Sequence, residues 1–408
     1  MSAPLDPTGA RASAALMALE ERYGAHNYHP LPVVVARAAG CWVQDPEGRR
    51  YLDFLSAYSA LNQGHRHPRI IEALKEQADR VTLTSRAFHN DQLGPFLAEL
   101  CTQLGFARAL PMNTGAEAVE TGIKACRRWG EQVKGVPAGR GQIIVCTHNF
   151  HGRTTTIVGF SSDADSREGF GPYGPGFVAV PFGDAAALEA AITPDTVAFL
   201  VEPIQAEAGI RVPPAGYLRA VREVCTRHRV LLFADEIQTG LGRAGRWLAC
   251  DWEDVRPDVV SLGKALGGGV LPVSALLADD EVMDVFTPGS HGSTFGGNPL
   301  AAAVARAALA VLRDEGLVER SERLGRELVA GIRGLGSPHV AEVRGRGLLV
   351  GVEIAAASGP ARPFCERLLE RGLLCKDTHG QTIRLAPPLV LSDDELGWAL
   401  DQLRAVLA

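Results

Sequence analysis

The sequence predicts an α/β fold in which a large domain with a mostly parallel sheet is followed by a smaller α+β domain. Between about residues 107 and 280, short apolar runs alternate with segments whose apolar residues recur at helical spacing. The runs are continuously apolar, as expected for strands that helices cover on both faces. After residue 298 this alternation ends, and Ala-rich and amphipathic helical segments follow. Alternating strands and helices are typical of a parallel sheet.

Each predicted element has its own local signal. Near the start, "GCWVQDPEGRRYLDFLSAYSA" predicts a hairpin with its turn at residues 45–48. The segment "GYLRAVREVCTRH" predicts a helix between two strands. Buried strands are predicted at 142–146, 197–201, 230–234, 258–262 and 273–278. We expect residues 1–60 to form an N-terminal segment that packs with the small domain, 61–298 the large domain, and 299–408 the small domain.

Capping residues predict where three helices begin. Asn298 followed by Pro299 is typical of an N-cap and first-turn proline. Ser392 with Glu395 forms a capping-box pattern before the last helix. "PMNTGAEAVE" at 111–120 has the same pattern, and it would also place the backbone N–H groups of residues 114–116 at a helix N-terminus. Such a terminus suits a phosphate dianion, although an ordinary helix cap would have the same sequence.

Composition argues against several classes of function. The chain of 408 residues carries a formal net charge of -6, whereas nucleic-acid binders usually present a basic surface. No apolar stretch approaches the roughly 20 residues of a membrane span, and the N-terminus lacks the pattern of a secretory signal. The eight cysteines show no C-x-x-C spacing, which argues against a zinc site or a disulfide framework. We expect a cytoplasmic protein with reduced thiols.

Chemically active residues follow four of the predicted strands. Glu202, Asp235 and Lys264 each come at the end of an apolar run, and "THNFHGR" brings Phe150 and Arg153 after another. Ligands of open α/β sheets bind at the carboxyl ends of the strands, so these side chains predict one active site.

Lys264, in "SLGKALGGG", stands before the glycines and is followed by Ala265. A nucleotide-binding P-loop needs the reverse order and a hydroxyl after the lysine. A covalent role fits better: pyridoxal phosphate uses a lysine, an acid beside the pyridinium nitrogen, a phosphate anchor and a stacking aromatic ring. A serine acyl-transfer site lacks its G-x-S-x-G motif, and G-x-G-x-x-G for a nicotinamide cofactor is missing. "GHRHP" at 64–68 and the pair His148 and His151 could ligate a metal, but no carboxylate or cysteine set accompanies them, so we expect no metal.

The motifs together resemble those of class III, fold-type I pyridoxal-phosphate aminotransferases along nearly the whole chain. They run in order through "NQGHRHP", "LTSRAF", "MNTGAEA", "NFHGRT", "EPIQAEAG", "ADEIQTGLGR", "LGKALGGG", "HGSTFGGNPL" and "THGQTIRLAPPL". "NYHPLPV", "TSRAF" and "NFHGRT" favour the ornithine branch of the family. The resemblance implies pyridoxal 5'-phosphate as cofactor and a seven-stranded, mostly parallel sheet in the large domain.

The resemblance also implies roles for individual residues. Lys264 would bind the cofactor covalently and move the proton, and Asp235 would pair with the ring nitrogen. The other residues expected around the cofactor are Thr114, Gly115 and Ala116 at the phosphate, Phe150 and Ile237 on the two ring faces, Gln238 at the ring hydroxyl, Glu202 in the supporting network, and Ser293 and Thr294 from a neighbouring subunit. The residues expected around the substrate are Tyr28 and Arg153 at ornithine's α-amino and α-carboxylate groups, Tyr58 as a wall, Arg384 at the α-carboxylate of glutamate or 2-oxoglutarate, and Glu207 masking Arg384 while ornithine is bound.

We therefore expect a homodimer with shared active sites that transfers the δ-amino group of L-ornithine to 2-oxoglutarate. The products would be glutamate 5-semialdehyde, which cyclises to pyrroline-5-carboxylate, and L-glutamate. Alternatives are the same chemistry on acetylornithine, lysine or 4-aminobutyrate, a racemase of the family, and a catalytically dead binding protein. Two residues depart from the expected pattern: Ala206 stands where glycine is expected and would stiffen the segment beside Glu207, and His151 stands where some relatives have a larger aromatic residue.

Overall fold

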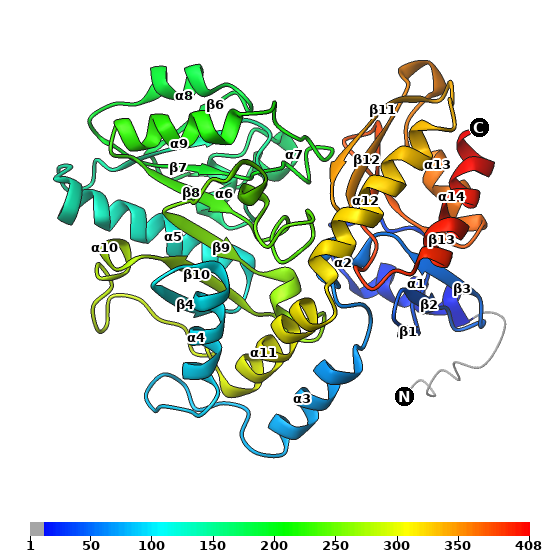
Figure 1. Ribbon diagram of the computed structural model, residues 1–408, viewed down its shortest axis with the longest axis horizontal. Coiled ribbons are helices and arrows are strands. Elements are labelled where there is room, and N and C mark those ends of the chain that lie inside the picture. The colour runs from blue at the N-terminus through cyan, green and yellow to red at the C-terminus, as the bar shows by residue number, and fades with distance from the viewer. Residues whose placement is uncertain (1–11) are drawn as a thin grey trace.

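The computed structural model describes residues 12–408, and its largest feature is a seven-stranded sheet (Figure 1). The strand order is β4-β10-β9-β8-β7-β5-β6. Strand β10 runs antiparallel to both β4 and β9, and the remaining pairs are parallel. The strands are β4 (Arg108–Met112), β5 (Gln142–Cys146), β6 (Phe177–Val180), β7 (Thr196–Val201), β8 (Leu231–Asp235), β9 (Val259–Leu262) and β10 (Ser274–Ala278). The predicted mostly parallel sheet is confirmed.

The five strands predicted from apolar runs are the inner ones, and each lies within one residue of its predicted bounds. The runs did not reveal β4 and β6, which form the two edges of the sheet. Both edge strands are partly exposed, and β4 contains Pro111, which an edge tolerates because it has fewer ladder hydrogen bonds to lose.

Helices cover both faces of this sheet, so successive residues of its inner strands pack in different clusters. In β8, Phe233 packs with Ile123 of helix α5 (Gly115–Trp129), whereas Leu232 packs with Val221 of helix α9 (Tyr217–Arg227). This double coverage is why the inner strands are continuously apolar. The other helices of this part of the chain are α3 (Pro68–Ala78), α4 (Leu93–Leu104), α6 (Thr155–Gly159), α7 (Ala164–Arg167), α8 (Ala185–Ala191) and α10 (Asp280–Met283).

Two smaller sheets lie beside this part. One has the order β11-β12-β15-β14, with β11 (Val340–Arg346), β12 (Leu349–Ile354), β14 (Lys376–Thr378) and β15 (Thr382–Leu385). The other joins β1 (Arg37–Ala39), β2 (Trp42–Gln44) and β3 (Arg50–Asp53) with β13 (Leu373–Leu374). The predicted hairpin is β2–β3, and its turn is closed by the N–H of Gly48 donating to the carbonyl of Asp45 at 3.1 Å.

The predicted helix starts are confirmed at their capping residues. Asn298 accepts a hydrogen bond from the N–H of Ala301 at the start of α11 (Pro299–Asp314). Ser392 and Glu395 form the predicted capping box of α14 (Asp393–Leu407). The remaining helices are α1 (Ala12–Tyr23), α2 (Ser56–Ser59), α12 (Leu317–Arg333) and α13 (Arg362–Glu370).

The division of the chain at residues 60 and 298 stays a prediction. Strand β3 pairs in parallel with β13, so the N-terminal segment joins the C-terminal part in one sheet. Helix α11 packs against α3 and α4, whereas α12 packs against β11 and α14.

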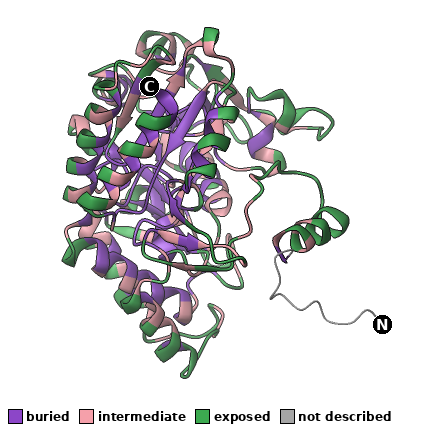
Figure 2. Cartoon of the chain, turned by 90° about the vertical axis from the view of Figure 1, so that its right-hand side faces the viewer, coloured by how far each residue is buried: buried purple, intermediate pink, exposed green. Residues whose placement is uncertain are grey.

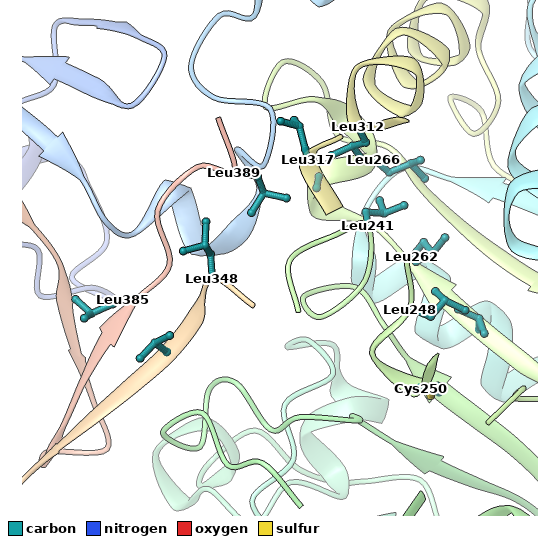
Figure 3. Packing of buried hydrophobic residues seen from close by; sticks show 14 of the residues in the cluster. Leu241, Leu248, Cys250, Leu262, Leu266, Leu312, Leu317, Leu348, Leu385 and Leu389 are labelled. Atoms are coloured by element: carbon teal, nitrogen blue, oxygen red, sulfur yellow. The ribbon is translucent and has the colours of Figure 1, made fainter. Parts of the chain in front are cut away.

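One apolar cluster runs through the seven-stranded sheet and the β11–β12–β15–β14 sheet (Figure 3). Leu262 and Leu266 lie on the side of the large sheet, and Leu348, Leu385 and Leu389 on the other side. All five are fully buried. By contrast, helix α1 stands apart from the body and is largely exposed (Figure 2).

Candidate active site

The carboxyl ends of the large sheet's strands surround a cavity of about 150 Å³. Eight of the residues predicted around the cofactor line it: Gly115, Ala116, Phe150, Glu202, Asp235, Ile237, Gln238 and Lys264. They come from the start of α5, the loops after β5 and β7, the end of β8 and the turn after β9. The sheet therefore brings together residues that are up to 149 positions apart in the chain, as Gly115 and Lys264 are.

Asp235 ends β8 and is held through both of its carboxylate oxygens. Oδ1 accepts hydrogen bonds from Ser261 Oγ and from the N–H of Ile237, each at 3.1 Å. Oδ2 lies 2.6 Å from Nδ1 of His151, whose side chain is fully buried. Because both oxygens are anchored, the carboxylate has a fixed orientation at the edge of the cavity.

Lys264 begins a 3₁₀ turn that is separated from β9 by Gly263, and it has φ of 45°. This left-handed conformation is unfavourable for a residue with a Cβ atom and costs about 1–3 kcal/mol, which suits a functional site better than a solvent-facing loop. Burial lowers the pKa of the Lys264 ammonium from 10.5 to about 8, although the negative charge of Glu207 opposes that change. At pH 7 about one tenth of the amine is therefore unprotonated and nucleophilic, far more than for an ordinary lysine.

The phosphate candidate is the N-terminus of helix α5. Thr114 and Glu117 form a complete capping box there, with the Thr114 hydroxyl accepting from the N–H of Glu117 at 3.2 Å. Gly115 packs so closely against Ile237 that an added Cβ would lie 3.0 Å from its side chain. The free N–H groups and the helix dipole make this 15-residue helix suitable for an anion.

Ser293 and Thr294 lie outside this cavity in the same chain. Ser293 Oγ accepts a hydrogen bond from Asn113 Nδ2 at 2.9 Å, next to the α5 cap, and Thr294 is exposed. Their predicted contribution from a neighbouring subunit stays a prediction.

Glu202 and Gln238 complete the cavity wall. Glu202 Oε2 accepts the N–H of Phe150 at 2.9 Å and so fixes the backbone of the ring-stacking candidate. Burial raises the pKa of Glu202 well above its usual value. Gln238 Nε2 donates to Glu207 Oε1 at 3.1 Å, which links this cavity to the neighbouring one.

A second cavity of about 780 Å³ adjoins the first, and Phe150 and Lys264 line both. All five residues predicted around the substrate line it: Tyr28, Tyr58, Arg153, Glu207 and Arg384. Arg153 follows β5 of the large sheet, whereas Arg384 belongs to β15 of a small sheet. Lys264 therefore lines a cavity that has two arginines contributed by different sheets.

Arg384 is 2% exposed and forms a bidentate ion pair with Glu207. Its Nη1 and Nη2 donate to the two carboxylate oxygens at 2.8 and 2.7 Å. Burial alone would raise the pKa of Glu207, but the charge and hydrogen bonds of Arg384 outweigh it and lower this pKa to about 2. The pair stays ionised throughout the physiological pH range.

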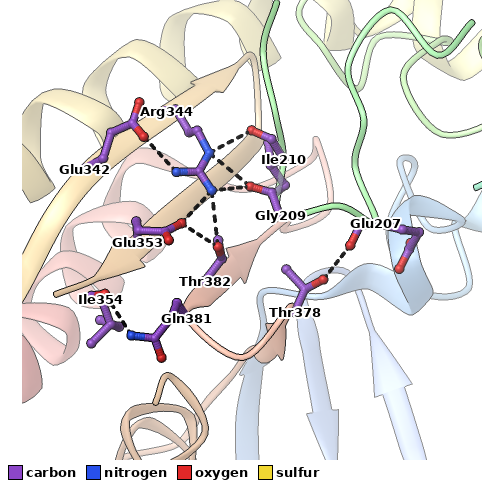
Figure 4. Close-up of polar contacts among 10 residues, drawn as sticks. All are labelled: Glu207, Gly209, Ile210, Glu342, Arg344, Glu353, Ile354, Thr378, Gln381 and Thr382. Carbon is purple, nitrogen blue, oxygen red and sulfur yellow. Dashed lines mark hydrogen bonds and ion pairs between the residues drawn. The ribbon is translucent and has the colours of Figure 1, made fainter. Parts of the chain in front are cut away.

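The loop that carries Glu207 is fastened to the β11–β12–β15–β14 sheet (Figure 4). Thr378 Oγ1 donates to the carbonyl of Glu207 at 2.7 Å, and Arg344 Nη2 donates to the carbonyl of Gly209 at 2.7 Å. Ala206 is fully buried in an apolar cluster with Ile210 and other residues, so the methyl group that departs from the expected glycine is packed.

Tyr58 reaches the same cavity from an unusual backbone turn. Its ring centroid lies 5.3 Å from Arg384 Cζ, within cation–π distance. Residues 56–59 all have positive φ, with values of 46°, 48°, 58° and 69°, and none is glycine. A left-handed turn of this kind costs roughly 1–2 kcal/mol per residue, so the surrounding structure must hold it.

The sequence interpretation missed the contact between His151 and Asp235. The signal for it is the position of His151 directly after the predicted ring-stacking residue Phe150. The two histidines of "GHRHP" pair with acids instead: His65 Nε2 lies 2.8 Å from Asp53 Oδ2, and His67 Nε2 lies 3.0 Å from Glu315 Oε1. Among residues 12–408, no group of three potential metal-ligating side chains is found.

The donors of the smaller cavity fit the predicted pyridoxal 5'-phosphate. Asp235 offers a carboxylate for a protonated ring nitrogen, Lys264 an amine for the aldehyde, and the start of α5 an anion site. Within the described part of the chain, His151 Nε2 and Gln238 Oε1 are buried polar atoms at this cavity without a hydrogen-bond partner. Unpaired buried polar atoms are costly, and a bound polar ligand would satisfy them.

Comparisons with known proteins agree with this geometry over nearly the full chain. The chain is 60% identical over 387 residues to an ornithine aminotransferase of Brevibacillus brevis, covering 95% of this chain and 96% of the relative. A solved structure of the ornithine aminotransferase of Toxoplasma gondii has partial occupancy of PLP at its active site. It is 44% identical to this chain and superposes with a TM-score of 0.96, and the match covers 98% of this chain and 95% of the Toxoplasma chain. A solved acetylornithine aminotransferase of Elizabethkingia anophelis gives a TM-score of 0.88 at 48% identity, with 97% and 98% covered. The model of the family described as "Aminotransferase class-III" matches residues 23–407, and the chain belongs to this family.

Proposed function

We propose that this protein is an ornithine aminotransferase that uses pyridoxal 5'-phosphate to move the δ-amino group of L-ornithine to 2-oxoglutarate. The observation that carries the proposal is the masked arginine: Arg384 lies in the cavity of Lys264 but is paired with Glu207 at 2.7 Å. An enzyme that accepts a terminal amine in one half-reaction and an α-amino acid in the other needs such a site. Relatives named ornithine aminotransferases at 58–60% identity support this substrate.

The first half-reaction requires Arg153 free and Arg384 masked. The planar fork of Arg153 would bind the α-carboxylate of ornithine, with Tyr28 near its α-amino group. The substrate would then extend toward Lys264 with its δ-amine leading. Because Glu207 neutralises Arg384, the carboxylate of ornithine is not drawn to that position, where it would present the wrong amine.

The proton is moved by Lys264. When bound, pyridoxal phosphate supplies an electron sink that makes the carbon next to the amine acidic. Asp235, held by His151 and Ser261, favours the protonated ring nitrogen on which that sink depends. Lys264 would hold the cofactor, and its Nζ, once free, would accept the proton that leaves the δ-carbon of ornithine. Its lowered pKa suits a base that works near neutral pH.

The second half-reaction requires Arg384. The α-carboxylate of 2-oxoglutarate would displace Glu207 and form the bidentate pair with Arg384, while Arg153 would bind the other carboxylate. Gln238 already donates to Glu207 and can hold it in its displaced position.

A comparison of amino donors tests the proposal. Turnover with 2-oxoglutarate is measured for L-ornithine, N-acetylornithine, L-lysine and 4-aminobutyrate, and pyrroline-5-carboxylate is trapped as the ornithine product. We expect ornithine to give the highest kcat/KM, and Lys264→Ala to abolish turnover. A clear preference for N-acetylornithine would show that this amine, and not ornithine, is the amino donor. Exchange of the α-proton without 2-oxoglutarate would identify a racemase instead.

We further propose a homodimer with shared active sites. Thr294 is exposed and Phe88 and Phe295 are 73% and 55% exposed, which suits a surface that a second subunit covers. A partner would then bring Ser293 and Thr294 to the phosphate. Light scattering would give the dimer mass, and Thr294→Ala would weaken cofactor binding.

We expect the enzyme to act in the cytoplasm. Among residues 12–408, no helix is long and apolar enough to cross a membrane. Cell fractionation would test the location.

A further inference from the structure

Arg243 and Arg384 are the largest fully buried side chains of the described residues, and Arg243 has no role in the proposed chemistry. Among residues 12–408, none of the hydrogen bonds of its guanidinium goes to a carboxylate, although Asp53 lies near enough for its charge to act on it. Its N–H groups donate instead to neutral oxygens: Nε and Nη2 to Asn62 Oδ1 at 3.1 and 2.6 Å, Nη1 to the carbonyls of Leu348 and Pro387 at 2.9 and 2.6 Å, and Nη2 to Ser56 Oγ at 3.1 Å. Burial lowers the pKa of Arg243 to about 9, and the charge of Asp53 opposes this change only in part. Burying this cation is therefore costly, and its hydrogen bonds join three separate segments.

Two of those segments carry the groups that form the carboxylate site. Pro387 follows β15, the strand of Arg384. Ser56 begins the left-handed turn that carries Tyr58. Ser56 Oγ also donates to the carbonyl of Ala386 at 2.6 Å, and the N–H of Ala386 donates to the carbonyl of Phe54 at 2.7 Å. The guanidinium and the Ser56 hydroxyl thus hold the end of the Arg384 strand against the Tyr58 turn.

The other side of the turn is held by Asp53. Its Oδ1 accepts the N–H groups of Leu55 and Ser56 at 2.9 and 2.8 Å, and its Oδ2 is paired with His65. Further along the same segment, Gln63 Nε2 donates to the carbonyl of Ala265, the residue after Lys264. The segment from Asp53 to His65 therefore spans the distance between the Arg384 strand and the Lys264 turn.

We propose that Arg243 is a positioning residue for recognition of the α-carboxylate at Arg384. It acts through Ser56 and Asn62, which fix the left-handed turn and so place the Tyr58 ring on the Arg384 guanidinium. Arg153 follows β5 and takes no part in these hydrogen bonds. Loss of the Arg243 contacts should consequently weaken the 2-oxoglutarate half-reaction and spare the ornithine half-reaction. The inference rests on the proposed function.

The test uses the cofactor-loaded enzyme and the variant Ser56→Ala, which removes one hydroxyl and leaves the buried cation satisfied elsewhere. We expect KM for 2-oxoglutarate to rise about tenfold, which corresponds to ~1.4 kcal/mol, while KM for L-ornithine changes less than about twofold. Arg243→Lys, which keeps the charge and loses the planar fork, should change the two constants in the same unequal way.

A rescue variant separates positioning from general damage. Ala57 is exposed and has φ of 48°, so Ala57→Gly removes the Cβ penalty of the left-handed turn. Added to Ser56→Ala, it should restore KM for 2-oxoglutarate to within about threefold of the wild type. Thr196→Val is the matched control: Thr196 is fully buried at the first residue of β7, away from the turn, and its Oγ1 donates to Gln142 Oε1 at 3.0 Å. It should leave both KM values unchanged.

Equal changes in the two KM values, the same imbalance in Thr196→Val, or no rescue by Ala57→Gly would each overturn the inference. If the wild-type enzyme transfers an amino group to 2-oxoglutarate from another amine but not from ornithine, ornithine is refuted as the amino donor. The effect of Ser56→Ala on KM for 2-oxoglutarate can then still be measured with that other amine. Calorimetric titration with glutarate, a dicarboxylate that does not react, gives the same comparison without turnover. If glutarate binds Ser56→Ala as tightly as the wild type, Arg243 does not position this site.

Discussion

Replacing Glu207 with glutamine should convert Arg384 from a masked to an open carboxylate site. In the wild type, the charge of Glu207 is stabilised by Arg384 so strongly that its pKa falls from 4.5 to about 2. That difference corresponds to about 3 kcal/mol, which sets the scale of the free energy that 2-oxoglutarate must supply to displace the carboxylate. Glutamine keeps an acceptor for one N–H of Arg384 but removes the charge. We expect KM for 2-oxoglutarate to fall by up to about 100-fold.

Steady-state kinetics with L-ornithine, L-glutamate and 2-oxoglutarate measures this effect. The Glu207→Gln enzyme should also use L-glutamate better relative to L-ornithine, because Arg384 is then open when ornithine binds. Glu342→Gln is a matched control, since Glu342 pairs with Arg344 at 2.8 Å but its side chain is 59% exposed. It should leave all three KM values unchanged. An unchanged or higher KM for 2-oxoglutarate in Glu207→Gln would refute the masking role.

Three further outcomes follow from the site. Because the pKa of Lys264 is lowered to about 8, the rate at which the apoenzyme captures pyridoxal phosphate should rise with pH through about 8 and level off above it. Stopped-flow absorbance traces at a series of pH values measure this rate, and an inflection near 10.5 would contradict the prediction. Arg153→Ala should reduce kcat/KM for ornithine at least tenfold more than that for glutamate, and equal losses would argue against its assignment. His151→Phe leaves Asp235 Oδ2 without its 2.6 Å contact and should speed loss of the cofactor during dialysis about tenfold. Visible absorbance measures the cofactor that remains bound, and loss at the wild-type rate would mean that His151 only fills space.

The sequence predicted the fold best where burial leaves a uniform signal. The inner strands β5, β7, β8, β9 and β10 are apolar throughout because both faces are covered, so their bounds were found within one residue. Strands β4 and β6 have one unpaired edge and are partly exposed, and β4 contains Arg108 and Pro111. Strand β6 is apolar but only four residues long, so neither strand gives a long apolar run.

The site was predictable in part from strand ends and in part only by resemblance. Asp235 and Lys264 follow strong strands, and the topology of a parallel sheet places them at one edge. The pairing of Glu207 with Arg384 joins residues 177 positions apart, and no local pattern encodes it. Arg243 was missed because an arginine within a Gly-rich turn usually lies at the surface, and its burial depends on oxygens from three distant segments.

The apolar cluster shared by the large sheet and the β11–β12–β15–β14 sheet limits how this enzyme can open. A hinge motion that separated the two sheets would expose fully buried leucines such as Leu266, Leu348 and Leu385 to water. Burial of one leucine side chain is worth about 1.5–3 kcal/mol, so wide opening would be expensive for every turnover. Exchange between ornithine and 2-oxoglutarate should therefore proceed through small swings of side chains such as Glu207. For the same reason, either half expressed alone should aggregate, and thermal unfolding of the whole chain should occur as one transition.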